Sequence, residues 1–130
     1  MKIIVETIPH ETQRYPTVGD YWEDGDGVVQ IRVSHMNDWR YVILVAVHEL
    51  AEMMLTRWRG ISEEAIGAFD MDFEKKRELG LVTGEPGDAP DAPYRREHFF
   101  ATNVERLLAA ELGVDWEVYE AHVDALGIKP

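Results

Sequence analysis

Residues 41–52 read YVILVAVHELAE, a long apolar run that ends in the ionisable side chains His48, Glu49 and Glu52. At 100° per residue, His48 falls on the apolar face of a helix and Glu52 lies one turn beyond it. An ionisable pair on an inward face costs free energy unless a partner, a proton or a metal compensates it. The segment therefore predicts a buried helix and a functional site within it.

The rest of the chain is expected to form a small sheet followed by further helices. Residues 2–8 predict a first strand, and residues 20–23 and 28–34 predict a hairpin around an Asp/Gly-rich turn. Capping residues and glycines bound predicted helices over residues 38–59, 62–80, 91–113 and 115–126. Their predicted N-caps are Asn37 or Asp38, then Ser62, Asp91 and Asp115. This order predicts an α+β fold, a small antiparallel sheet packed on about four helices, as a single domain over residues 1–130.

Two loops have alternative interpretations. The turn DGDG at residues 24–27 has the composition of a calcium loop, but Val28 and Gln30 break the alternating oxygen ligands of that motif, so we interpret it as a turn. Residues 81–92, LVTGEPGDAPDA, are rich in Pro, Gly and Asp and predict an ordered loop or a mobile flap.

Composition excludes several classes of function. The 25 acidic and 13 basic residues give a net charge of −12, which disfavours binding to nucleic acid or to an anionic membrane. The longest apolar run is too short to cross a bilayer. Because the chain has no cysteine, any metal must be bound by His, Asp or Glu. The first residues do not read as a signal peptide, so we expect a cytoplasmic location.

The spacing of His48 and Glu52 favours a metal site. Side chains at i and i+4 stand above one another, so one helix can offer two ligands to one ion. Glu49 lies 100° around the helix, where it can reach a metal-bound water and act as general base in hydrolysis. The alternative interpretation of His48 is a hydrogen-bonded core histidine, and Arg59 is an alternative partner for Glu52.

Two segments resemble a known class of enzyme. His48-Glu49-Leu50-Ala51-Glu52 resembles the His-Glu-x-x-His helix of zincin metallopeptidases, with Glu52 where the second His stands. Residues 97–108, EHFFATNVERLL, resemble the third-ligand helix of the ImmA/IrrE-type metallopeptidases, minimal gluzincins in which a glutamate ligand lies three positions before an Ala. Here His98 stands three positions before Ala101.

This resemblance implies a catalytic Zn²⁺, or another divalent metal, held by His48, Glu52 and His98. The two departures from the family pattern compensate each other, since two imidazoles and one carboxylate remain. The implied protein is a small zinc-dependent metallopeptidase of phage or mobile-element type, with a zincin-like fold and Glu49 as the base. Its peptide or protein substrate would bind along residues 28–34, and Tyr94 or His35 would stabilise the oxyanion.

Other residues are expected near the site, or excluded from it. Glu97, Glu105 and Asp70 are candidates for an alternative ligand or for hydrogen bonding to a ligand. The three remaining histidines are not expected to bind metal: His10, His35 and His122.

Two further classes of function compete with the peptidase. One is a catalytically inactive zincin-like module that binds a basic partner through its acidic surface. The other is a helical enzyme with two metals on carboxylates, which would use Glu49, Glu52 and Glu97 with His98 and Asp70. That plan has no place for the β-rich first third of the chain.

Overall fold

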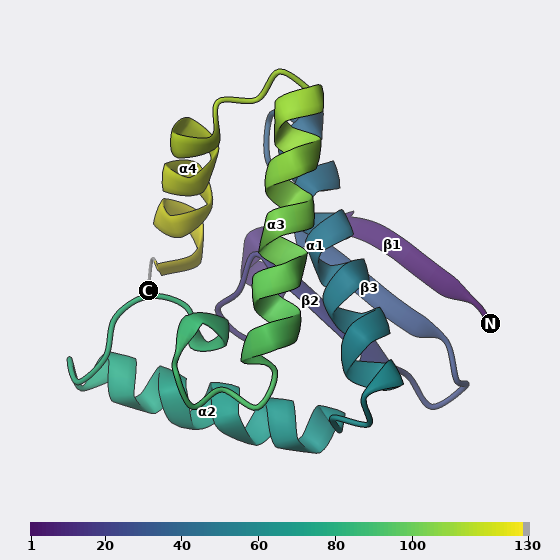
Figure 1. The fold of residues 1–130 in the computed structure, drawn as a ribbon, viewed down its shortest axis with the longest axis vertical. Helices are drawn as coiled ribbons and strands as arrows, with labels where there is room; N and C mark the ends of the chain where they lie inside the picture. The colour runs from purple at the N-terminus through teal and green to yellow at the C-terminus, as the bar shows by residue number, and fades with distance from the viewer. Residues whose placement is uncertain (129–130) are drawn as a thin grey trace.

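A three-stranded mixed sheet forms the first third of the protein (Figure 1). Strands β1 (Ile3–Ile8), β2 (Gly19–Glu23) and β3 (Val29–Ser34) lie in the order β1-β3-β2. β2 and β3 form the expected antiparallel hairpin, whereas β1 pairs with β3 in parallel. The computed structural model describes residues 1–128.

The parallel pairing of β1 corrects the expectation of a purely antiparallel sheet. In β3, Val29, Ile31 and Val33 alternate on one face and are almost fully buried. This most buried strand takes the centre of the sheet and uses both of its edges, one for β2 and one for β1. The short 3₁₀ helix His10–Thr12 and the loop after it carry the chain from β1 to the far edge, where β2 runs in the opposite direction.

Four α-helices follow the sheet, which confirms the α+β class. They are α1 (Trp39–Trp58), α2 (Glu63–Glu78), α3 (Arg95–Glu111) and α4 (Trp116–Ile128). α1 packs on β2 and β3 and lies beside α3, as Figure 1 shows. α2 crosses the ends of both helices, and α4 lies on the other side of α3.

The helix starts follow capping chemistry in three cases out of four. Asp38, Ser62 and Asp115 each accept a hydrogen bond from a backbone N–H of the first turn, as expected of N-caps. The prediction of Asp91 as the cap of α3 is wrong. The carbonyl of Ala92 accepts from the backbone N–H of Arg95, so a turn of the main chain leads into α3 and no side chain caps it.

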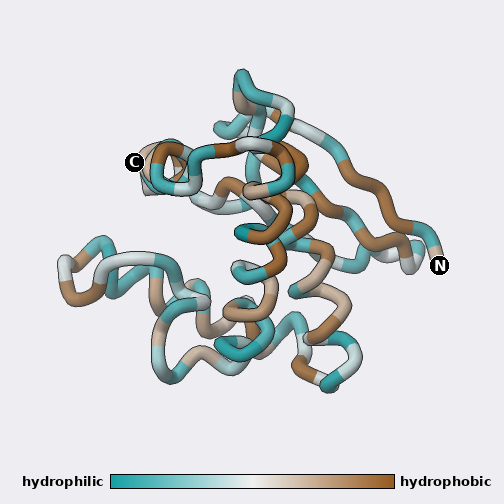
Figure 2. Tube along the Cα trace, turned by 45° about the horizontal axis from the view of Figure 1, so that its top comes forward, coloured by the Kyte–Doolittle hydropathy of each residue, from teal (hydrophilic) through white to brown (hydrophobic). Residues whose placement is uncertain are grey.

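One apolar core lies where the sheet meets α1, α3 and α4. Hydrophobic segments of the trace gather there in Figure 2. β3 supplies Ile31, α1 supplies Leu44, α3 supplies Ala109 and α4 supplies Tyr119, each at most 1 % exposed. Within residues 1–128, no helix is long and apolar enough to cross a membrane.

Candidate metal centre

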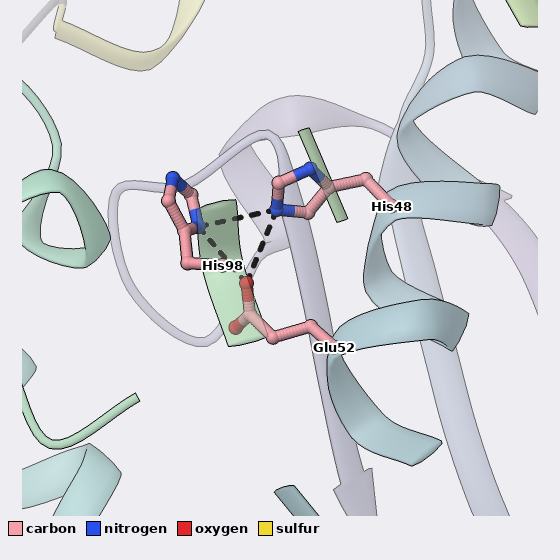
Figure 3. Close-up of side chains that lie close together, drawn as sticks. All are labelled: His48, Glu52 and His98. Carbon is pink, nitrogen blue, oxygen red and sulfur yellow. Dashed lines mark hydrogen bonds and ion pairs between the residues drawn. The ribbon is translucent and has the colours of Figure 1, made fainter. Parts of the chain in front are cut away.

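α1 and α3 bring three potential metal ligands together in the interior (Figure 3). His48 and Glu52 stand one turn apart on α1, with 3.1 Å between His48 Nε2 and Glu52 Oε2. His98, in the first turn of α3, points between them. Its Nδ1 lies 2.9 Å from Glu52 Oε2 and 3.2 Å from His48 Nε2. All three side chains are buried.

The donor set and its spacing fit a zinc ion. Zinc takes imidazole nitrogen and carboxylate oxygen, and in a tetrahedral site with bonds of about 2.1 Å the ligand atoms are about 3.4 Å apart. The three donor atoms here are already within a few tenths of an ångström of that separation. Three protein ligands leave a fourth position for water, the arrangement of catalytic rather than structural zinc sites.

Each imidazole has an acceptor on its other nitrogen. His48 Nδ1 lies 2.8 Å from Glu105 Oε1, and the other oxygen of Glu105 accepts a hydrogen bond from the Tyr119 hydroxyl. His98 Nε2 lies 3.2 Å from Asp88 Oδ1 and 3.4 Å from Glu85 Oε2. Such acceptors orient ligand histidines and fix which nitrogen faces the metal. Glu105 therefore contacts a potential ligand and lies outside the triad itself.

The turn that carries Asp88 is packed against the ring of His98. A 3₁₀ turn, η2 (Pro86–Asp88), lies in the loop between α2 and α3, so this part of residues 81–92 is ordered. Gly87 lies so close that a Cβ built on it would be 2.5 Å from Cγ and Nδ1 of His98. Only glycine leaves room for the imidazole at this point.

The pKa values of the three side chains are those of mutually paired charges. Burial by itself lowers the pKa of His48, but hydrogen bonds to Glu105 and Glu52 outweigh it and raise the pKa to about 10. The pKa of His98 is raised to about 12 by Asp88, Glu52 and Glu85 against the same desolvation. Burial raises the pKa of Glu52, yet bonds to both histidines bring it down to about 2. A divalent cation would take the place of the protons on the imidazoles.

Glu49 occupies the position next to the triad on the side of the sheet. It lines the same cleft as His48 and Glu52 and is half-buried. Burial, and then the charge of Glu52, raise its pKa well above the ordinary value. A Cβ on Gly19 would lie 2.6 Å from Glu49 Oε1, so the missing side chain of Gly19 allows β2 and α1 to approach at this point.

A cleft of about 1140 Å³ opens onto these residues. Its walls come from β2 and the loop before it, from all four α-helices, and from the η2 turn. Tyr15 and Tyr94 line it together with the triad and Glu49. Tyr94 donates a 2.5 Å hydrogen bond to Asp70, so its hydroxyl is already engaged.

The other sequence candidates lie elsewhere. Glu97 is buried and paired with Arg59 at 2.6 Å, so Arg59 does not neutralise Glu52. Asp70 lines the cleft but contacts Tyr94, not the triad. His10 hydrogen-bonds to Ser34, His35 is exposed, and His122 is exposed beside Tyr41, all away from the cleft.

Sequence reasoning missed several residues that contact the triad or line its cleft. Glu85, Gly87 and Asp88 lie in the segment predicted as an ordered loop or a mobile flap, and Tyr119 lies on the last helix, for which the sequence predicts no residue of the site. Their spacing in the sequence carries no signal, because only the packing of η2 and α4 around α3 brings them to the histidines.

Comparisons with known proteins return no match: no family model, no curated protein and no solved structure is similar to this chain. The function must therefore be argued from the site.

Proposed function

We propose that this protein is a zinc-dependent hydrolase that cleaves peptide bonds. The observation that carries the proposal is the convergence of His48, Glu52 and His98, from two helices, at the floor of a cleft. Bound zinc would supply Lewis-acid activation of water and of the scissile carbonyl. Helical zinc proteins with two imidazoles and one carboxylate at the metal are commonly hydrolases.

Glu49 is the proposed general base. It borders the same cleft, adjoins His48 in the chain, and has a pKa raised by burial and by Glu52. A carboxylate with a raised pKa accepts a proton from water and returns it to a leaving amine more readily near neutral pH.

The expected place of the substrate requires a correction. Of the expected residues 28–34, Val29–Ser34 form the central strand β3, whose two edges are taken by β1 and β2, so a substrate cannot pair with it. β2 is one of the two edge strands of the sheet, and its residues Gly19–Trp22 line the cleft. An extended peptide would add to this edge, with its backbone held by main-chain hydrogen bonds.

The expected hydrogen-bond donors to the oxyanion also require a correction. His35 is exposed and away from the cleft, and the hydroxyl of Tyr94 already donates a hydrogen bond to Asp70. Tyr15 lines the cleft beside Tyr94, and its hydroxyl makes no hydrogen bond within the described residues. A free hydroxyl at the cleft wall is a suitable donor to a developing oxyanion.

Metal content of the purified protein tests the proposal directly. We expect about one zinc per chain in the wild type and in the control His35→Ala, whose side chain is exposed. The variants His48→Ala and His98→Ala should lose the metal, because each removes one of three ligands. Absence of stoichiometric zinc in the wild type would overturn the proposal.

Catalysis needs a second measurement on zinc-loaded protein. A peptide library analysed by mass spectrometry should show cleavage by the wild type and little by Glu49→Gln, which keeps all three ligands. Zinc binding with no cleavage of any peptide would instead support the inactive, metal-binding module.

A further inference from the structure

The last helix, α4, is connected to the candidate metal centre by a buried series of hydrogen bonds. His48 Nδ1 lies 2.8 Å from Oε1 of Glu105, and the hydroxyl of Tyr119, on α4, donates to Oε2 of the same carboxylate. The residues His48, Glu105 and Tyr119 are 8 %, 9 % and 1 % exposed, respectively. Within residues 1–128, no Lys or Arg forms an ion pair with Glu105, and its polar side-chain partners there are the imidazole of His48 and the hydroxyl of Tyr119.

These two hydrogen bonds together fix the orientation of the His48 imidazole. With Nε2 of His48 turned to Glu52 and His98, Nδ1 must donate, and Glu105 is its acceptor. A carboxylate held by one bond can still rotate about its last torsion. The hydroxyl of Tyr119 holds the second oxygen, so the plane of the carboxylate and the direction of the imidazole are both set.

The position of Tyr119 depends on how α4 docks. Its ring packs edge-on against Tyr41 of α1, with 5.0 Å between ring centroids. It also packs in a tilted arrangement against Trp116 of α4 itself, with 5.3 Å between centroids. If α4 shifted, the hydroxyl would leave Glu105 with an unpaired oxygen in the interior, which is unfavourable because a buried acceptor that loses its donor finds no water to replace it. Docking of α4 and orientation of His48 therefore favour each other.

We propose that Tyr119 is a positioning residue of the metal centre, and that zinc binding stabilises the docking of α4 through Glu105 and Tyr119. The inference rests on the proposed zinc site. Energetic coupling is reciprocal: a helix that improves the affinity for the metal must itself be held more firmly once the metal is bound.

Amide hydrogen exchange and zinc affinity, measured on the full chain, test this coupling. In the wild type, zinc should slow exchange in α4 by about 5-fold or more, the lower end of typical coupling factors. Tyr119→Phe should weaken zinc binding by about 10- to 100-fold and remove the zinc response of α4. Tyr41→Phe is the matched control, because it makes the same change in the adjoining ring without touching Glu105, and it should behave as the wild type.

Two further measurements separate positioning from simple loss of structure. The visible spectrum of the cobalt-substituted protein reports ligand geometry and should change in Tyr119→Phe but not in Tyr41→Phe. Glu105→Gln can keep both contacts while removing the charge, with its amide oxygen accepting from His48 Nδ1 and its amide N–H donating to the hydroxyl of Tyr119. It should lower zinc affinity and yet preserve the zinc response of α4, and it replaces Tyr119→Phe as the test if that variant does not fold.

The outcomes distinguish this inference from the proposed function. A wild type that binds no zinc overturns the zinc site and the coupling together. Zinc binding that leaves α4 exchange unchanged, or equal zinc affinity in Tyr119→Phe and the wild type, overturns the coupling alone.

Discussion

At the scale of single residues, buried charges in this protein have partners on other elements of the fold. Glu97 is 3 % exposed and pairs with Arg59 at the end of α1. Asp70 on α2 accepts from Tyr94, and Glu105 on α3 accepts from Tyr119 on α4. Removal of one partner leaves a buried carboxylate with fewer donors, and this costs more than loss of an exposed pair.

Replacement of Arg59 by Ala should destabilise the protein. Glu97 would remain buried without its cation, and we expect a loss of about 2–3 kcal/mol in the free energy of unfolding, measured in urea. The matched control is Arg57→Ala, whose partner Glu23 lies 3.8 Å away at the exposed surface, with an expected loss of about 0–1 kcal/mol. Adding Glu97→Gln to Arg59→Ala should recover part of the loss, because the second change removes the unpaired charge. Equal losses in Arg59→Ala and Arg57→Ala would contradict this account.

Asp70 should make stability depend on pH. Burial raises its pKa from 3.8 to about 6 in the folded state, against the hydrogen bond from Tyr94 and with the charge of Glu52 adding to the rise. The ionised form is thus disfavoured by folding, so the penalty is present above pH 6 and disappears as pH falls toward 4.

Asp70→Asn keeps an acceptor for Tyr94 and removes the charge. The variant should be more stable than the wild type at pH 7.5, and this advantage should shrink at pH 4.5. Urea unfolding of both proteins at the two pH values checks this; a constant difference would show that Asp70 does not titrate in this range.

At the scale of elements, the site depends on two long helices and one short turn. α1 supplies His48 and Glu52 from successive turns, and α3 supplies His98 from its first turn. The η2 turn places Asp88 at Nε2 of His98 and presses the backbone of Gly87 against the ring. This short 3₁₀ turn, closed by backbone hydrogen bonds from Asp88 to Glu85 and from Ala89 to Pro86, thus determines which nitrogen of His98 faces Glu52.

Gly87→Ala should impair the metal site more than the fold. The added Cβ would meet the His98 ring at 2.5 Å, so either η2 or the imidazole must move. We expect zinc affinity to fall at least about 10-fold, in the range seen when the surroundings of a ligand are disturbed. Gly25→Ala, where the added Cβ has no neighbour within 4 Å, is the control, and titration with a competing chelator measures both. Unchanged affinity in Gly87→Ala would mean that η2 yields without moving the ring.

At the scale of the whole molecule, a bound ion would join the two halves of the chain. His48 and Glu52 precede the loop and helix of residues 59–94, and His98 follows them, so one ion would link α1 with α3 across that segment. The acidic chain, with a net charge of −12, also gains from a cation in its interior.

Zinc should therefore raise the melting temperature of the protein. At a free zinc concentration 100 times the dissociation constant, the folded state gains about 2.7 kcal/mol, equivalent to about 10 °C for a chain of this size. Differential scanning fluorimetry of chelator-treated protein with added zinc measures the shift. His98→Ala should show almost none; a similar shift in that variant would place the stabilising ion elsewhere.

The sequence by itself determined the class of the fold and the closeness of two side chains of the candidate site, His48 and Glu52. Apolar periodicity and capping residues predict four helices, and the DGDG turn predicts the β2–β3 hairpin, because these are local properties of neighbouring residues. The i, i+4 spacing likewise predicts that His48 and Glu52 lie together, since helix geometry fixes that distance.

Only the tertiary structure decided the parallel pairing of β1, the approach of His98 to α1, and the acceptors on both imidazoles. These contacts join segments such as residues 48 and 105, or 98 and 88, whose meeting follows from how helices and turns pack. A resemblance in sequence proposed His98 as a partner, but neither periodicity nor composition states which faces of α1, α3 and α4 meet. That choice depends on the shape and volume of the whole core, which no local pattern encodes.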